Sequence, residues 1–386
     1  MSDNYTEVTT QGWGSRLKNS IGGVVGGLVL FVLSFVVLFW NEGNSVKTIR
    51  ALDEVAAATV SVSVDDVRAS NDGKLVHVTG TAITEDILSD SMFKVSENAM
   101  MLSRDVEMYQ WKENVSTKEE KEVGGKTKTT KTYSYSKEWS SSEIDSESFK
   151  KPDGHKNPKM VIEAMTSYAS SAKFGGYELS GEQIAMISGA DSYEYKPEQL
   201  EKTANVIKSR SSLHNGGVYM GEDPSSPEVG DYRISFKIIN PSREISVIGQ
   251  QQGNRLSSYS AKSGKSIFLL DSGIKSKDEM ITAAKDANAM MTWILRLVGF
   301  LMMFGGLNLL FRPLSVLGDV VPIIGSIIGM GFTIVSFLIS VSLSALTIAI
   351  AWIFFRPLVG VLLLVVTIGA IAGLFYLKKK KTAAVN

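Results

Sequence analysis

The side chains that could carry catalysis or bind a metal are few and widely separated. The chain has three histidines, His77, His155 and His214, and no cysteine. No two histidines have the four-residue spacing that puts two metal ligands on one helix face. The lack of cysteine also excludes disulfides, thiolate metal sites and a cysteine nucleophile. The sequence therefore predicts no metal and no cofactor.

Other catalytic signatures are also missing. Residues 221–231 carry four carboxylates among prolines and glycines, but without the ligand spacing of a calcium loop. The sequence contains neither a glycine-rich phosphate loop nor a Gly-x-Ser-x-Gly nucleophile elbow. Forty basic and forty acidic side chains balance, and no basic face or nucleic-acid motif is apparent, so no nucleic-acid partner is expected. These observations favour a protein that is not an enzyme.

Apolar residues crowd both ends of the 386-residue chain, which predicts a membrane protein. Residues 21–40 lack charge and have the length that an α-helix needs to cross a bilayer. Trp40 suits the membrane interface, and the residues after it make a poor signal-peptide cleavage site, so we expect a retained span. Residues 294–311, within 320–355, and 358–377 predict three further spans. The long stretch 320–355 favours one helix, with a hairpin bent at Gly325, Gly329 and Gly331 as the alternative.

The expected architecture is therefore an α-helical membrane protein of about four spans with a large α+β domain outside the cytoplasm. Its parts are a cytoplasmic N-terminus (1–20), transmembrane helix 1 (21–40), the α+β domain (41–291), a C-terminal cluster of three spans (292–377) and a basic cytoplasmic tail (378–386). The lysines of the tail set this orientation under the positive-inside rule. They are also predicted to contact lipid headgroups, and they are Lys378, Lys379, Lys380 and Lys381.

Alternating apolar residues predict strands at 59–67, 74–82, 101–114 and 131–139. The third and fourth form a predicted hairpin, whose charged tip (116–130) we expect to be solvated or mobile. Helices are predicted at 159–171 and 197–209, and more strands at 232–239, 244–250, 254–260 and 266–270. A helix at 276–296 is expected to run from the domain directly into the second span.

Small residues recur every four positions in the spans, a pattern that lets helices pack closely in lipid. This predicts helix packing, within the chain or between copies, although glycine is also simply common in membrane helices. The candidate packing residues are Gly22, Gly23, Gly26, Gly27, Asn308, Ser336, Ser340, Ser344, Gly369 and Gly373. The span centres carry no charged side chain, which argues against an ion-coupled carrier. Arg296 is near a helix end and is expected to extend its charge to the interface.

Several separate motifs then resemble one family, the transmembrane protein 43 (LUMA) family, along nearly the whole chain. The motifs include residues 106–111, 305–309 and 352–358, and above all three groups: Trp40, Asn41, Glu42 and Gly43; His155, Lys156, Asn157 and Pro158; and Pro227, Glu228, Val229, Gly230 and Asp231. The resemblance implies four spans and a lumenal or extracytoplasmic domain. It also implies self-association and the organisation of other membrane proteins or lipids. It supplies no catalytic residues. The missing cysteines and the charged hairpin suggest a distant bacterial relative.

The predicted function is thus a non-enzymatic, multi-pass membrane scaffold that self-associates into a homo-oligomer. Membrane lipids and other membrane proteins are its expected partners. The predicted location is a bacterial inner membrane with a periplasmic domain, or the endoplasmic reticulum and inner nuclear membrane if the chain is eukaryotic. Two alternatives stay open: a channel or transporter gated by the outer domain, and an envelope hydrolase that uses His155 or His214.

Overall fold

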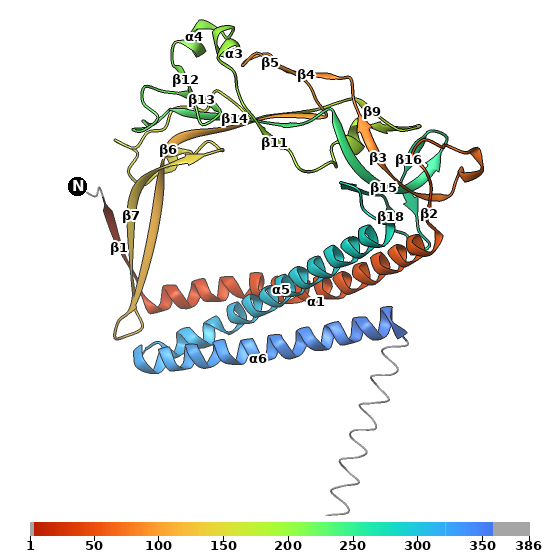
Figure 1. Cartoon of the computed structure of the whole chain (residues 1–386). Coiled ribbons are helices and arrows are strands. Elements are labelled where there is room, and N and C mark those ends of the chain that lie inside the picture. The colour runs from red at the N-terminus through yellow and green to blue at the C-terminus, as the bar shows by residue number, and fades with distance from the viewer. Residues whose placement is uncertain (1–3, 321, 358–386) are drawn as a thin grey trace, which may run out of the picture.

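The computed structural model describes residues 4–320 and 322–357, and in it long helices lie beneath an arch of β-structure (Figure 1). The long helices are α1 (Trp13–Ala58), α5 (Lys277–Gly318) and α6 (Pro322–Phe355). Each is long and apolar enough to cross a membrane. The protein is therefore a multi-pass membrane protein with a large additional domain. The predicted fourth span (358–377) and the basic tail lie outside the described residues.

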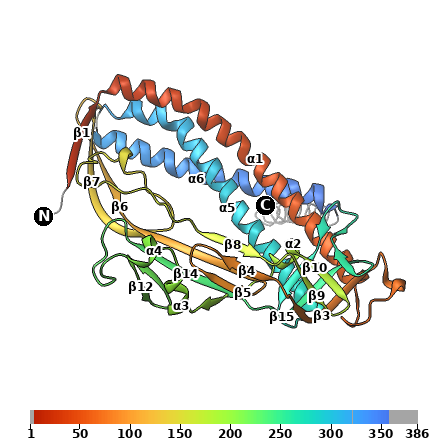
Figure 2. The same ribbon diagram turned by 90° about the horizontal axis from the view of Figure 1, so that it is seen from above.

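The three helices lie side by side and pack against one another (Figure 2). α1 has 46 residues and α5 has 42, lengths of about 69 and 63 Å at 1.5 Å per residue. The hydrocarbon core of a bilayer is about 30 Å thick. Both helices are thus much longer than one crossing requires. Their remaining turns continue into the β domain without a break.

Several predictions for these helices are confirmed, and one is wrong. The helix expected to run from residue 276 into the second span is α5, and Ser276 caps it in a capping box with Glu279. Within the stretch 320–355, residues Pro322–Phe355 form one helix, as favoured over a hairpin. The second span does not end at Arg312-Pro313, because α5 continues through Pro313 to Gly318.

The domain is rich in β-structure and contains two sheets. An eight-stranded sheet consists of β1 (Tyr5–Gln11), β7 (Thr127–Ser140), β6 (Met101–Lys121), β14 (Tyr232–Ile239), β13 (Gly217–Met220) and β12 (Ser211–His214) in that order, with β11 (Asp191–Tyr193) on β14 and β8 (Met165–Tyr168) on β6. Short helices α3 (Pro197–Glu201) and α4 (Asn205–Lys208) lie near its far edge (Figure 1).

The second sheet closes on itself as a small barrel. Its ring consists of β3 (Leu75–Ile83), β15 (Ser242–Gln252), β16 (Arg255–Ser257), β10 (Tyr177–Ser180) and β9 (Ser171–Phe174), with β19 (Leu269–Ser272) on β15 and β2 (Val60–Ser61) on β3. Helix α2 (Gly181–Ile184) and the pairs β4 (Ile87–Asp90) with β5 (Val95–Asn98) and β17 (Tyr259–Ser260) with β18 (Ser266–Ile267) complete the domain. Closure removes the free strand edges of the ring.

Three local predictions fail in this domain. Residues 159–171 do not form a helix: they contribute β8 and the start of β9. The predicted helix 197–209 is broken into α3 and α4, and the predicted strand 59–67 is reduced to the two residues of β2. In the first case the pairing of β8 with β6 overrides the local pattern.

The β6–β7 hairpin is longer and better ordered than its charge suggests. The strands pair from Met108 with Ser140 out to Lys121 with Thr127, so only residues 122–126 form the turn. Polar side chains pair across the strands, for example Asn114 with Ser136. The charged tip is therefore paired in the sheet up to the turn, while residues 114–121 are exposed to solvent, as the charge predicted.

The hairpin reaches the start of α1, whereas the barrel contacts the other end of the same helix (Figure 1). Strand β1, just before α1, pairs with β7 from Tyr5 opposite Tyr133 to Gln11 opposite Thr127. Residues 5–11 and the domain are thus in contact here, although a four-span topology puts them on opposite sides of a bilayer. The number of crossings and the side of each terminus stay predictions.

Candidate functional site

A buried cluster of charges lies where α1, α5 and α6 meet. Glu42 is 2% exposed, and its two carboxylate oxygens accept hydrogen bonds from Arg296 Nε at 2.6 Å and Nη2 at 2.9 Å. Trp352 Nε1 of α6 donates to Glu42 Oε2 at 2.8 Å. A charged pair excluded from water is stable only when its hydrogen bonds are satisfied. This two-point pairing meets that condition and joins the three helices.

Aromatic rings cover the cation of this pair. The Arg296 guanidinium lies 4.6 Å from the ring centre of Trp293 and 5.9 Å from that of Trp352. An arginine over a tryptophan face is attracted by the ring quadrupole, more strongly when water is excluded. Arg296 therefore does not extend freely to the interface as expected but is bound on several sides.

Next to the ion pair, hydrogen bonds join α1 to α5. Asn41 Nδ2 donates to the carbonyl of Thr292 at 3.0 Å, and the Thr292 hydroxyl donates to Ser45 Oγ at 2.8 Å. Asn288 Nδ2 also donates to Ser45 Oγ, at 3.1 Å. Asn41 and Glu42 thus both hold α1 against its neighbours, whereas Trp40 is 58% exposed on the outer face. The arrangement fixes helices and presents no nucleophile.

A second charged cluster lies at the opposite end of the helices. Asp319, at the turn between α5 and α6, is 1% exposed and pairs with Arg16 at 2.5 Å and with Lys121 at 2.7 Å. Arg16 Nη1 also donates to the carbonyl of Gly125, and Trp13 Nε1 donates to that of Val316. One carboxylate therefore joins the start of α1, the hairpin tip and the α5–α6 turn.

Replacing Asp319 by alanine is expected to release the hairpin tip. Arg16 and Lys121 lose a buried counter-ion, which removes the contact that holds residues 122–126 on the helices. Tryptic cleavage after Lys121 and Lys126, measured by mass spectrometry on the purified chain, should become faster. Asp105→Ala removes only an exposed pair with Lys237 and serves as the control. Equal cleavage rates in the two variants would contradict this role.

The small residues of α1 separate into a packed pair and an open pair. A Cβ on Gly27 would lie 2.8 Å from Leu309 Cβ and 2.9 Å from the carbonyl oxygen of Gly306, so α1 and α5 touch there through backbone. Gly23 faces Leu309 at 3.8 Å. By contrast, Gly22 and Gly26 have no described atom within 4 Å of such a Cβ. Only the second pair is left open to another chain.

The serines of α6 face inward. Ser336 and Ser340 are fully buried, and their hydroxyl oxygens have no hydrogen-bond partner within the described residues. Ser344 Oγ lies 3.6 Å from Met303 Sδ of α5. Asn308 Nδ2 donates to the carbonyl of Phe304 in its own helix, so it is not the bond between helices that the sequence suggested. Gly369, Gly373, Lys378, Lys379, Lys380 and Lys381 lie outside the described residues.

The two loop motifs of the domain meet beside β6. Asn157 makes three hydrogen bonds to backbone: it accepts from Trp111 N and donates to the carbonyls of Trp111 and Ile144. Gly230 has φ of +98°, and a Cβ there would lie 3.0 Å from Pro158 Cγ. These positions therefore require an amide and a glycine for structural reasons.

The same region buries an acidic side chain. Asp231 Oδ2 accepts hydrogen bonds from the Tyr219 hydroxyl at 2.5 Å and from Glu228 N at 2.8 Å. Burial, together with the hydrogen bond to Asp231, raises the pKa of the Tyr219 hydroxyl. A tyrosine that keeps its proton beside a carboxylate acts as a donor, so this pair closes the loop rather than serving as a base. Lys156, Pro227 and Val229 complete the two motifs.

The histidines are not arranged for catalysis. His155 is 3% exposed, stacks on Tyr135 with ring centres 3.9 Å apart, and meets Trp111 edge-on. His214 pairs with the neighbouring Asn215 on the surface. Within residues 4–320 and 322–357, no cluster of His, Cys, Asp and Glu side chains could bind a metal ion. The arrangement offers no support for the hydrolase alternative.

His77 is expected to make the domain sensitive to acid. Its ring lies between Ser61 Oγ, at 3.1 Å, and the carbonyl of Lys275, at 3.0 Å, and burial lowers its pKa from the ordinary value of 6.5. The unfolded chain then binds a proton below pH 6.5 that the folded chain does not yet bind. The contribution to stability is complete above pH 6.5 and is lost as the pH falls toward the lowered pKa.

The measurement is thermal unfolding of the purified chain across that pH range. The loss of stability on acidification should be smaller in His77→Gln than in the parent, because glutamine takes up no proton. His214→Gln, on the surface, is the control and should keep the full loss. Identical pH profiles for His77→Gln and the parent would rule the assignment out.

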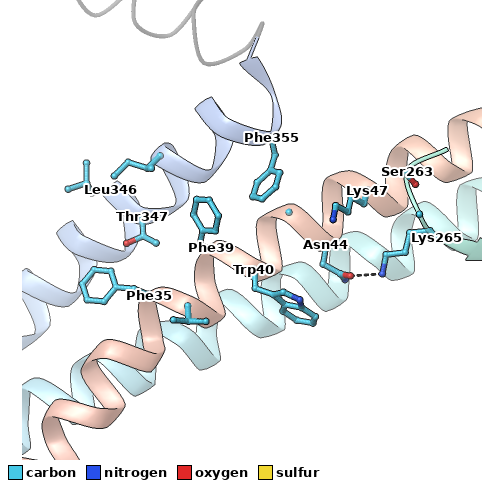
Figure 3. Close-up of a pocket in the computed structure, with 14 residues that line it drawn as sticks. Phe35, Phe39, Trp40, Asn44, Lys47, Ser263, Lys265, Leu346, Thr347 and Phe355 are labelled. Carbon is cyan, nitrogen blue, oxygen red and sulfur yellow. Dashed lines mark hydrogen bonds between the residues drawn. The ribbon is translucent and has the colours of Figure 1, made fainter. Parts of the chain in front are cut away.

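A large cavity opens between α1, α6 and the loop of residues 261–265 (Figure 3). Its volume is about 780 Å³. Aromatic and aliphatic side chains form one part, and two lysines with Asn44 and Ser263 form the other, as Figure 3 shows. Sequence reasoning missed this site, since the loop and the two helices are far apart in the chain.

Comparison with known proteins identifies the family. The sequence model of the family Transmembrane protein 43 matches residues 108–357, more than half of the chain. Transmembrane protein 43 of Rattus norvegicus is 37% identical over 367 residues, covering 91% of this chain and 89% of its own. The Homo sapiens protein is 35% identical over 386 residues, covering 94% and 95%. The Drosophila melanogaster homolog is 32% identical over 347 residues, covering 88% and 90%.

No solved structure matches this chain. The relationship covers 94% of the chain, and the family model spans the loops beside β6 as well as Arg296 and Trp352. The chain is a member of the transmembrane protein 43 family.

Proposed function

We propose that this protein is a non-enzymatic membrane scaffold that self-associates and organises membrane proteins or lipids. The observation that carries the proposal is the continuity between helices and domain. Ala51, Leu52 and Val55 of α1 share one buried cluster with Met280 and Ile281 of α5 and with barrel residues. The Glu42–Arg296 pair joins the same two helices further along their length. A domain held in this way keeps a fixed position relative to the helices. A membrane protein or lipid that binds the domain is then held in a fixed position as well.

Self-association has a specific candidate surface on α1. Gly22 and Gly26 are exposed and lie among exposed apolar side chains such as Ile21 and Val25. In lipid, the apolar side chains give no net driving force, whereas small residues let two helix backbones approach closely. A second copy could therefore pack along Gly22 and Gly26 without disturbing the Gly27 contact with α5.

The proposed placement keeps the domain outside the cytoplasm and the basic residues 378–381 inside, while the pairing of β1 with β7 holds residues 5–11 next to the domain. The location that fits this topology is a bacterial inner membrane with a periplasmic domain, or a lumenal domain in a eukaryotic cell. The lysine run supports this orientation through the positive-inside rule.

Cysteine cross-linking in native membranes tests the surface, because the chain has no cysteine of its own. Gly22→Cys and Gly26→Cys should each give a disulfide-linked dimer under mild oxidation. Gly23→Cys is the matched control: it lies on the same helix but faces Leu309 of its own chain, and should stay monomeric. The absence of dimers from both Gly22→Cys and Gly26→Cys would refute self-association through this face.

A further inference from the structure

The large cavity has an apolar part and a cationic part, which follow one another along α1. Phe35 and Phe39 of α1 face Leu346 and Ile350 of α6 across the apolar part. About one turn beyond the uncharged stretch 21–40, the wall becomes polar, with Asn44 and Lys47 of α1 opposite Lys265 of the 261–265 loop. An apolar part next to a cationic part matches the acyl chain and the anionic headgroup of a phospholipid.

The polar end of the cavity contains hydrogen-bond donors and no carboxylate side chain. None of the residues that line the cavity is Asp or Glu. Lys265 Nζ lies 2.5 Å from Asn44 Oδ1, which holds its ammonium group at the opening, while Lys47 is exposed and makes no ion pair within the described residues. Ser263 Oγ is buried at the same end and has no hydrogen-bond partner there. A buried hydroxyl without a partner loses hydrogen bonds that water would give, so the site lacks an acceptor.

We infer that this cavity binds one molecule of an anionic glycerophospholipid, with the phosphate at Lys47, Lys265 and Ser263 and an acyl chain between α1 and α6. The phosphate oxygens supply the acceptor that Ser263 lacks and the negative charge that two lysines require. A volume of about 780 Å³ exceeds a headgroup and accommodates part of a chain. The inference rests on the proposed membrane role and names the lipid class that this role involves.

Native mass spectrometry of the full chain, released from nanodiscs, tests the inference. Nanodiscs of phosphatidylcholine with a minor share of phosphatidylglycerol should give a protein that retains phosphatidylglycerol preferentially. The double variant Lys47→Gln/Lys265→Gln should lose this preference by roughly thirtyfold, the effect of two headgroup charges. Lys262→Gln removes a lysine of the same loop outside the cavity and should behave as the parent.

Two further arms separate the sources of the signal. Ile350→Trp fills the apolar part and should remove the bound lipid while both lysines stay in place. Inorganic phosphate added in excess should not displace phosphatidylglycerol, because it has no acyl chain. Retention that is unchanged in the double variant, or displacement by phosphate alone, would overturn the inference. A parent protein that retains no lipid would also overturn the inference, because the cavity would then be covered by protein.

The same spectra report the oligomeric state, which keeps this result separate from the scaffold proposal. Loss of lipid with an intact oligomer in Lys47→Gln/Lys265→Gln would leave self-association in place. A monomeric parent that still retains phosphatidylglycerol would refute the scaffold proposal and support the lipid site.

Discussion

Glu42→Leu is expected to cause the largest loss of stability of any single substitution in the helical part. It removes both hydrogen bonds of the Arg296 guanidinium and the acceptor of Trp352 Nε1. An uncompensated buried charge typically costs about 3–5 kcal/mol. Because Glu42 also links α1 to α6, the variant should lose contacts between all three helices.

The measurement is the temperature at which half of the purified protein remains monodisperse in detergent. The double variant Glu42→Leu/Arg296→Met is the control, since it removes both charges and leaves similar volume. Replacing a whole buried ion pair by apolar residues is often nearly neutral, so most of the stability should return. A single variant as stable as the parent would show that water reaches Arg296 and that the pair does not hold the helices together.

Gly27→Val is expected to push α1 away from α5 and to destabilise the helical unit by roughly 2 kcal/mol or more. Its new Cβ would lie 2.8 Å from Leu309 Cβ and 2.9 Å from the carbonyl oxygen of Gly306. The second of these atoms is backbone and cannot move aside by changing a rotamer. The helices must therefore separate. The contacts that Phe31 and Leu38 of α1 make with α5 then weaken.

Gly26→Val is the matched control in the adjacent position. No described atom lies within 4 Å of its Cβ, so the fold of a single chain should be unaffected. Both variants can be compared by thermal stability in detergent, where self-association is first removed by dilution. Equal losses in the two variants would mean that the glycines matter only through helix propensity, and not through the contact with α5.

The sequence was sufficient to predict the parts of the fold that depend on local composition and periodicity. The uncharged run 21–40 and the long stretch 320–355 specify helices in lipid because their backbone groups must be satisfied within the segment. Strand β14 and the hairpin β6–β7 follow from alternation of apolar and polar residues. The capping box at Ser276 and Glu279 marks the start of α5.

The remainder depends on contacts between distant segments. Residues 159–171 have a helical pattern, but β8 pairs with β6 from Arg104 to Met101, and this pairing decides their structure. The ion pair joins residues 254 positions apart. One signal for it existed: an acid at position 42 and a base at position 296 each flank an apolar stretch, and two such charges stabilise each other by pairing. The cavity at Lys47 and Lys265 left no comparable signal.

The protein is proposed to be a self-associating scaffold whose domain and helices move as one unit. The most direct measurement is the mass of the full chain in nanodiscs, by native mass spectrometry over a range of protein concentrations. The account predicts a discrete oligomer that persists on dilution in the membrane and is lost in Gly22→Val/Gly26→Val. A monomer at every concentration would contradict it, and the small-residue face of α1 would then face lipid alone.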